Sequence, residues 1–276
     1  MGMDVRKAAV AGRFYPGKAG DLRKAVESFT RKAAGRAQVD AKAVLVPHAG
    51  YVYSGAAAGE VFASVRLPQR IAILCPNHTG DGAPLALAPA GAWETPLGLA
   101  EVDAEMNAAL LKECPHLKED AAAHRRDHAI EVQLPFLQVL RPGFRFSAIC
   151  VRSVDYGALE ALGHALARVA AASRAKAGVD VLPVISSDMT HYVTAGVAER
   201  QDRMALAHVE ALDPRGLYRT VVGNDITMCG FAPAVAVLVA CRDLGATKGE
   251  TVCYTNSGAA SGDFSDVVAY AGVVIR

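Results

Sequence analysis

Short apolar runs that stop abruptly at a polar turn constrain the fold of this chain more than any other feature. Residues 43–46 form the first run, which a proline, His48 and a glycine turn follow. The pattern recurs where residues 71–75 end in Pro-Asn-His, where residues 181–185 end in Ser-Ser-Asp, and where residues 227–230 precede an apolar helix. Open α/β sheets present their chemistry in this way, at the carboxyl edge of the strands. We therefore expect these four segments to meet at one edge of a sheet.

Strands and helices alternate along most of the chain. Apolar patterns predict strands at residues 43–46, 71–75, 85–88, 144–151, 179–185, 251–254 and 267–275. Helical patterns begin near Asp21, Ser54, Asp103 and Asp127, and others cover residues 159–169, 197–212 and 231–240, with a polar connection at 35–42 and a turn-rich loop at 93–98. This alternation predicts a three-layer α/β/α sandwich around a largely parallel or mixed sheet. Because no linker or internal repeat divides the chain, we expect one domain spanning residues 1–276.

Composition excludes several classes of function. The net charge is +1 with acids and bases mixed along the chain, so no surface for nucleic acid or acidic membranes is expected. The longest apolar stretch, residues 231–241, contains a proline and is too short to span a bilayer. Six cysteines lie far apart without a C-x-x-C pair, and the first residues carry charges rather than a signal-peptide core. We therefore expect reduced thiols and a cytoplasmic protein.

Three residues from these strand exits are candidate metal ligands. His48 and His78 each follow an apolar strand and a proline, and loops from consecutive strands are commonly spatial neighbours. Cys229 precedes an apolar helix, where a thiol is expected to have a lowered pKa. The alternative is that both histidines bond only to backbone and that Cys229 is a small buried residue. Two imidazoles and a thiolate would suit iron(II), copper or zinc, with positions left open for substrate.

Two further pairs are candidates for proton transfer. Asp188 and His191 lie three residues apart after a strand, so Asp188 can orient His191 and His191 can move protons for a metal-bound substrate. The alternative is a turn cap beside a surface histidine. His128 and Glu131 lie one helical turn apart and are either partners of the metal ligands, a second acid/base pair, or a solvated helix start.

The remaining aromatic and imidazole side chains are interpreted as structural. His116, His124, His164 and His208 lie in charged or helical settings and are expected at the surface, whereas Phe14, Tyr15 and Trp93 are expected to pack.

The combined motifs resemble a known family. They are P-H-A-G-Y at 47–51, P-N-H at 76–78, W-E-T-P-L-G at 93–98, D-H-A-I-E-V-Q-L-P at 127–135, S-S-D-M-T-H-Y at 186–192 and M-C-G at 228–230, with A-G-R-F-Y-P-G at 11–17. In this order they resemble the Memo family, whose prokaryotic members are called AmmeMemoRadiSam system protein B. The resemblance covers nearly the whole chain.

The resemblance implies a fold similar to the class III extradiol (LigB-type) dioxygenases, which carry non-haem iron. It implies metal ligands at His48, His78 and Cys229, with Asp188 beside the metal and His191 in the place of the acid/base histidine. One departure is that those dioxygenases complete their ligand set with a carboxylate, where this chain has Cys229. A thiolate favours softer metals and is itself oxidisable, so ring cleavage is not carried over.

Two hypotheses of different class follow. The first is a metal-dependent redox enzyme, iron-based and O₂-using, that acts on a small phenolic molecule. The second is a binding or scaffold protein whose pocket holds a peptide or a partner encoded in the same operon. The family name implies association with an AMMECR-type protein and a radical-SAM enzyme, and the family has been linked to iron or copper binding and, in animals, to phosphopeptide binding.

Overall fold

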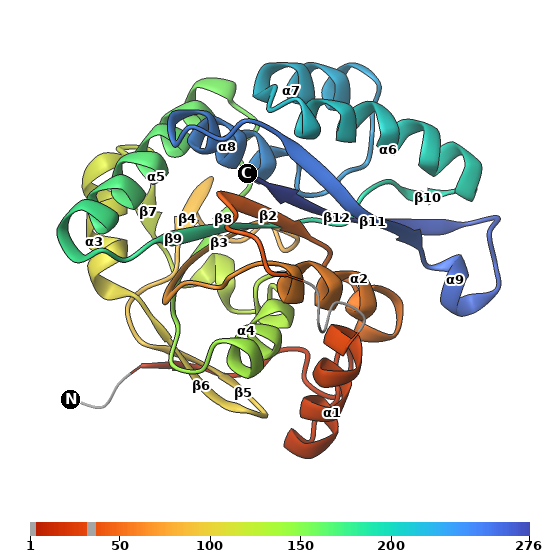
Figure 1. The fold of residues 1–276 in the computed structure, drawn as a ribbon, viewed down its shortest axis with the longest axis horizontal. Coiled ribbons are helices and arrows are strands. Elements are labelled where there is room, and N and C mark those ends of the chain that lie inside the picture. The colour runs from red at the N-terminus through yellow and green to blue at the C-terminus, as the bar shows by residue number, and fades with distance from the viewer. Residues whose placement is uncertain (1–3, 32–36) are drawn as a thin grey trace.

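A twisted, mostly parallel sheet forms the centre of the computed structural model, which describes residues 4–31 and 37–276 (Figure 1). Its strands are β1 (Val5–Arg6), β2 (Ala43–Val46), β3 (Arg70–Pro76), β4 (Leu85–Leu87), β5 (Ala92–Thr95), β6 (Gly98–Val102), β7 (Lys118–Glu119), β8 (Arg145–Val151), β9 (Val181–Ser186), β10 (His191–Val193), β11 (Gly249–Asn256) and β12 (Val267–Ile275). Along the sheet the order is β1-β5-β6-β8-β3-β9-β2-β12-β10, with β11 on β12 and β4 and β7 beside β8. The four central strands β8, β3, β9 and β2 are parallel, so their carboxyl ends share one edge.

Helices cover both faces of this sheet, which confirms the predicted α/β/α sandwich. The helices are α1 (Ala19–Thr30), α2 (Tyr51–Ser64), α3 (Ala104–Glu113), α4 (Leu134–Leu140), α5 (Tyr156–Ala177), α6 (Ala195–Glu210), α7 (Pro214–Gly223), α8 (Phe231–Asp243) and α9 (Gly258–Ser261), with 3₁₀ turns η2 (Ala122–His124) and η3 (Glu131–Gln133). In Figure 1, α3 and α5 to α8 lie on one side of the sheet and α1, α2 and α4 on the other. None of the helices in the described ranges has the length and apolar character that a membrane crossing requires.

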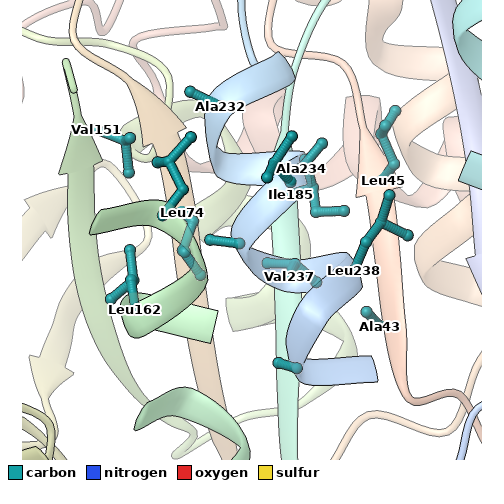
Figure 2. Close-up of a cluster of buried hydrophobic side chains, with 14 of the residues drawn as sticks. Ala43, Leu45, Leu74, Val151, Leu162, Ile185, Ala232, Ala234, Val237 and Leu238 are labelled. Carbon is teal, nitrogen blue, oxygen red and sulfur yellow. The ribbon is translucent and has the colours of Figure 1, made fainter. Parts of the chain in front are cut away.

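The central strands are buried on both faces, because each face packs against helices. In β2, Ala43 and Leu45 point into one core while Val44 and Val46 point into the other. Figure 2 shows α8 lying across β3, β9 and β2, with Ala234, Val237 and Leu238 among the strand side chains. Close contact of α8 with α5 requires Gly163, where an added Cβ would lie 2.4 Å from the carbonyl oxygen of Ala236.

Several element boundaries differ from those predicted. Helix α2 begins at Tyr51 rather than after Ser54, because the chain turns directly at Gly50. Asp103 caps α3 as predicted, accepting a hydrogen bond from the backbone nitrogen of Met106. The helix expected from Asp127 starts only at Leu134, so Pro135 lies in its first turn, where a missing N–H is tolerated.

Other expectations were wrong or fall partly outside the described residues. The loop expected at 93–98 is the hairpin formed by β5 and β6, and the sequence patterns missed α7. His124, expected at the surface, is 2% exposed, whereas His116 is exposed and His164 and His208 are half-buried. The polar connection expected at 35–42 lies partly outside the described residues.

Candidate metal centre

A cleft of about 610 Å³ opens at the carboxyl edge of the central strands. His48 follows β2, His78 follows β3 and Asp188 follows β9, and the parallel register of these strands places all three at that edge. His128 comes from the turn before η3, and His191 begins β10. These five side chains line the cleft together, although up to 143 residues separate them in sequence (48 to 191).

Three imidazoles converge in the cleft. One nitrogen from each of His48, His78 and His128 lies within 4.8 Å of the other two. Their ring centroids are 5.0 Å (His48–His78), 5.5 Å (His48–His128) and 4.7 Å (His78–His128) apart. This spacing allows three nitrogens to reach one ion with small side-chain movements, since metal–nitrogen bonds are about 2.0–2.1 Å long. The sequence patterns had paired His128 with Glu131 instead.

Hydrogen bonds determine the tautomer of His48. Its Nδ1 lies 3.0 Å from the hydroxyl of Ser186. That hydroxyl donates its proton to the carbonyl oxygen of Ala129 (2.7 Å) and accepts from the amide of Gln133 (2.9 Å). Ser186 therefore has only an acceptor site left for His48, so Nδ1 carries the proton and Nε2 keeps its lone pair. Burial, together with the nearby His78, holds the pKa of His48 well below its usual value, which favours this neutral ring.

A carboxylate orients His78 in the same way. Asp127 accepts from the backbone nitrogen of His78 (2.8 Å) and lies 3.2 Å from its Nδ1. A carboxylate only accepts, so Nδ1 carries a proton and Nε2 faces away from Asp127. Burial disfavours the charged ring, but the hydrogen bond and charge of Asp127 outweigh it and raise the pKa of His78. Burial and the neighbouring His78 lower the pKa of His128 to about 4, so that ring is neutral.

Asp188 and His191 both face the cleft, but they are not bonded as the sequence had indicated. Asp188 accepts from the backbone nitrogen of His48 (2.7 Å), and burial raises its pKa to about 7. His191 is oriented by Thr227, whose carbonyl oxygen lies 2.9 Å from Nδ1 and whose hydroxyl accepts from the backbone nitrogen of His191. The prediction that Asp188 orients His191 was wrong, because the Asp188 carboxylate is turned toward the turn after β2.

The sulfur of Cys229 borders the imidazoles without joining their cluster. It lies 3.3 Å from Nε2 of His48 and accepts from the backbone nitrogen of Asp188 (3.3 Å). The prediction of a lowered thiol pKa was wrong: burial and the charge of Asp188 raise it, and they outweigh the helix start that follows Cys229. As a thiol, Cys229 can donate to the unprotonated Nε2 of His48.

Comparison with known proteins identifies the family. Residues 6–274 match the family model described as Memo-like protein. The chain belongs to the Memo family. A MEMO1 family protein of Aquifex aeolicus is 42% identical over 276 residues, and the match covers 99% of each chain. MEMO1 family proteins of Methanopyrus kandleri and Methanothermobacter thermautotrophicus are 38% and 37% identical, covering 98% and 97% of this chain and 99% of each relative.

In this Memo-family chain, Glu131 belongs to a structural network below the cleft. Its carboxylate is fully buried and accepts from the side chain of Arg6 (2.6 Å), the backbone nitrogens of Ala9 (2.8 Å) and Val10 (3.0 Å), and the hydroxyl of Tyr15 (2.7 Å). These four donors occupy both oxygens, so Glu131 ties the N-terminal segment to η3. The turn before η3 is not α-helical, which is why Glu131 does not pair with His128.

The residues that orient the cleft histidines of this Memo-family chain were not found from the sequence. Asp127, Ser186 and Thr227 each bond to a cleft histidine, whereas the sequence patterns predicted a helix cap at Asp127 and no partner for Ser186 or Thr227. Closeness in sequence to the histidine motifs was the only signal that could have found these residues, and it does not show which residue bonds to which histidine. The resulting donor set fits a transition-metal ion, because the nitrogens of three differently supported imidazoles converge beside a sulfur.

Proposed function

We propose that this Memo-family protein is a metal-dependent redox protein whose resident ion is iron(II), with copper or zinc as competitors. The convergence of three imidazole nitrogens within 4.8 Å of one another at the cleft floor carries this proposal. His48 and His78 are the two ligands common to the geometry and to the family resemblance. When bound, such an ion supplies Lewis acidity and, for iron or copper, electron transfer to oxygen.

The third ligand has two candidates. The geometry offers His128, while the resemblance implies Cys229. The 3.3 Å between the Cys229 sulfur and Nε2 of His48 suits two ligands of one ion, since bonds of about 2.0 and 2.3 Å place ligands roughly 3.2–3.6 Å apart. Metal analysis of His128→Ala and Cys229→Ala separates these sets, because only loss of a true ligand removes the ion or changes its absorption spectrum.

Two cleft side chains are placed to hold protons. His191 carries its proton on Nδ1, which the carbonyl of Thr227 accepts, so Nε2 is the basic nitrogen. Burial lowers the pKa of His191, which keeps the ring neutral and able to accept a proton. The pKa of Asp188, raised to about 7, lets this carboxyl either give or take a proton near neutrality.

The cleft fits a small aromatic substrate. Its volume of about 610 Å³ lies in the range of small-molecule pockets, and Phe14, Tyr53, Tyr192 and Tyr270 contribute rings to its lining. These rings can stack on a phenol while its hydroxyl approaches the histidines. Because iron(II) is kept in reducing surroundings and the six cysteines are expected to stay reduced, we place this activity in the cytoplasm.

Anaerobic purification followed by metal analysis and an oxygen-uptake screen over a panel of phenols tests the proposal. We expect about one iron per chain and uptake with at least one phenol. His191→Ala should keep the metal and lose uptake, which separates proton transfer from metal binding. Absence of any stoichiometric transition metal would refute the proposal.

A second candidate function is binding of a peptide or protein partner. The observation that favours it is a rim of exposed aromatic side chains near the cleft: Tyr192 is 76%, Phe264 53% and Tyr53 44% exposed. An AMMECR-type protein and a radical-SAM enzyme are the partners that the family name implies. If His191→Ala complements a deletion strain as well as the wild type does, binding rather than catalysis is the function.

A further inference from the structure

Two thiols outside the cleft lie against one another in the core. Cys75 on β3 and Cys150 on β8 are directly opposite residues of two adjacent parallel strands. Both side chains point into the same core, and both are almost completely buried. Their sulfur atoms are 3.3 Å apart, within hydrogen-bond distance for thiols. In the sequence, 75 residues separate these two cysteines, and no C-x-x-C spacing links them.

A histidine determines which of the two sulfurs donates the hydrogen bond between them. Nε2 of His124 lies 3.2 Å from the carbonyl oxygen of Ala86, which can only accept, so Nε2 carries the proton. Nδ1 is then a lone pair, and it lies 3.5 Å from the sulfur of Cys150. The competing acceptor for the Cys150 proton, the carbonyl of Ala123, is farther away at 3.7 Å. Cys150 therefore donates to His124, and Cys75 donates to Cys150.

This chain of hydrogen bonds activates one sulfur and not the other. The bond donated by Cys75 lowers the pKa of Cys150, and His124 adds to this effect although burial opposes it. Burial and the neighbouring sulfur raise the pKa of Cys75. A thiol that ionises readily beside a thiol that stays protonated is the arrangement that dithiol oxidation requires.

A second cavity lies beside His124, although neither cysteine lines it. It has a volume of about 160 Å³, and Arg6, Trp93, Ala88 and His124 are among the residues that line it. The volume exceeds that of several water molecules, since each occupies about 30 Å³ in the liquid. His124 is thus the residue that both lines this cavity and lies 3.5 Å from the Cys150 sulfur, and we infer that a small oxidant enters by this route.

We propose that Cys75 and Cys150 are a redox-active dithiol that hydrogen peroxide oxidises to a disulfide, with His124 as the base. His124 takes the Cys150 proton, and the thiolate attacks one peroxide oxygen. The O–O bond breaks, and hydroxide leaves as water with the proton from His124. Cys75 then attacks the sulfenic sulfur, the S–S bond forms, the S–O bond breaks, and the Cys75 proton leaves with the second water. Two thiols lose two electrons, which reduce one peroxide to two waters.

Mass spectrometry of the native protein tests the proposal. The purified full-length chain is treated with hydrogen peroxide, its remaining thiols are blocked with N-ethylmaleimide, and it is digested with trypsin without reductant. Cys75 is the only cysteine in the tryptic peptide 71–112, and Cys150 the only one in 146–152. We expect these two peptides to be joined and to separate on reduction with dithiothreitol. Blocked thiols at both positions, or sulfinic acid at Cys150 without the cross-link, would overturn the proposal.

Variants test the individual roles. Cys75→Ala and Cys150→Ala should abolish the cross-link, while Cys241→Ala, a matched change at a thiol buried in the core on the other face of the sheet, should leave its yield unchanged. His124→Asn should slow its formation about tenfold or more, and an unchanged rate in a folded His124→Asn protein refutes the base role. The cross-link should also form in His48→Ala, since this chemistry does not use the metal centre. Its loss there would assign the oxidation to the metal and overturn the proposal.

Discussion

Replacing Glu131 with glutamine should unfold the protein more easily without altering its chemistry. One carboxylate oxygen accepts from Arg6 and Ala9, and the other accepts from Val10 and Tyr15. A glutamine side chain has one oxygen and one NH₂ group, so one orientation turns the NH₂ toward the donors of Arg6 and Ala9. The other turns it toward Val10 and Tyr15, of which only the Tyr15 hydroxyl can accept. Arg6 also loses its partner in a buried ion pair. Breaking such a pair costs about 3–5 kcal/mol, which we take as the loss in the free energy of unfolding.

Urea denaturation followed by circular dichroism measures this loss. For 276 residues an entropy of about 2.1 cal/mol/K per residue converts it into a fall in Tm of roughly 5–9 °C. Glu94→Gln is the matched control, because Glu94 pairs with Lys7 at the exposed surface and should change stability by less than about 0.5 kcal/mol. Metal content of the folded Glu131→Gln protein should equal that of the wild type. A loss below about 1 kcal/mol, or a folded variant without metal, would show that Glu131 serves the site instead.

The remaining predictions concern charge at the cleft. Metal affinity should rise as the pH rises past the raised pKa of His78, because a metal ion and a proton compete for Nε2 of that ring. Calorimetry of metal binding in buffers of different ionisation enthalpy should detect about one released proton. Asp127→Asn should weaken metal binding about 10–100-fold, whereas Asp81→Asn, at an exposed ion pair, should not, as competition with a chromophoric chelator will show. Asp188→Asn should stabilise the metal-free protein above pH 7. The folded-state pKa of Asp188 is about 7, whereas its ordinary value is 3.8, so the stability of the wild type falls as pH rises between these two values. If the denaturation midpoint of each protein is the same at about pH 5 and at about pH 8, this prediction is wrong.

Local patterns in the sequence predicted the central strands closely. The run at 43–46 is β2 with the same bounds, and 71–75 and 181–185 each lie within one strand of the sheet. These runs are recognisable because a strand buried on both faces must be apolar at every position. The β5–β6 hairpin was harder to predict, since three of the five residues of β6 are exposed and the hairpin includes a turn sequence.

The sequence alone could not show which side chains contact one another. Cys75 and Cys150 became neighbours only when β3 and β8 aligned in parallel register, and nothing local marks either residue as one of a pair. Likewise, Asp188 was assigned to His191 on spacing, yet its carboxylate bonds across the sheet edge to the backbone of His48.

The sequence by itself determined the α/β alternation, the family, and which histidines stand at strand ends, because these depend on residue type and short-range periodicity. Tertiary structure decided that His128 joins His48 and His78 at one point, which ring nitrogen carries the proton, and that Glu131 bonds to the N-terminal segment. Those properties depend on hydrogen bonds between residues far apart in the chain, such as Ser186 with His48 and Asp127 with His78, and such contacts exist only once the sheet has brought its strands together.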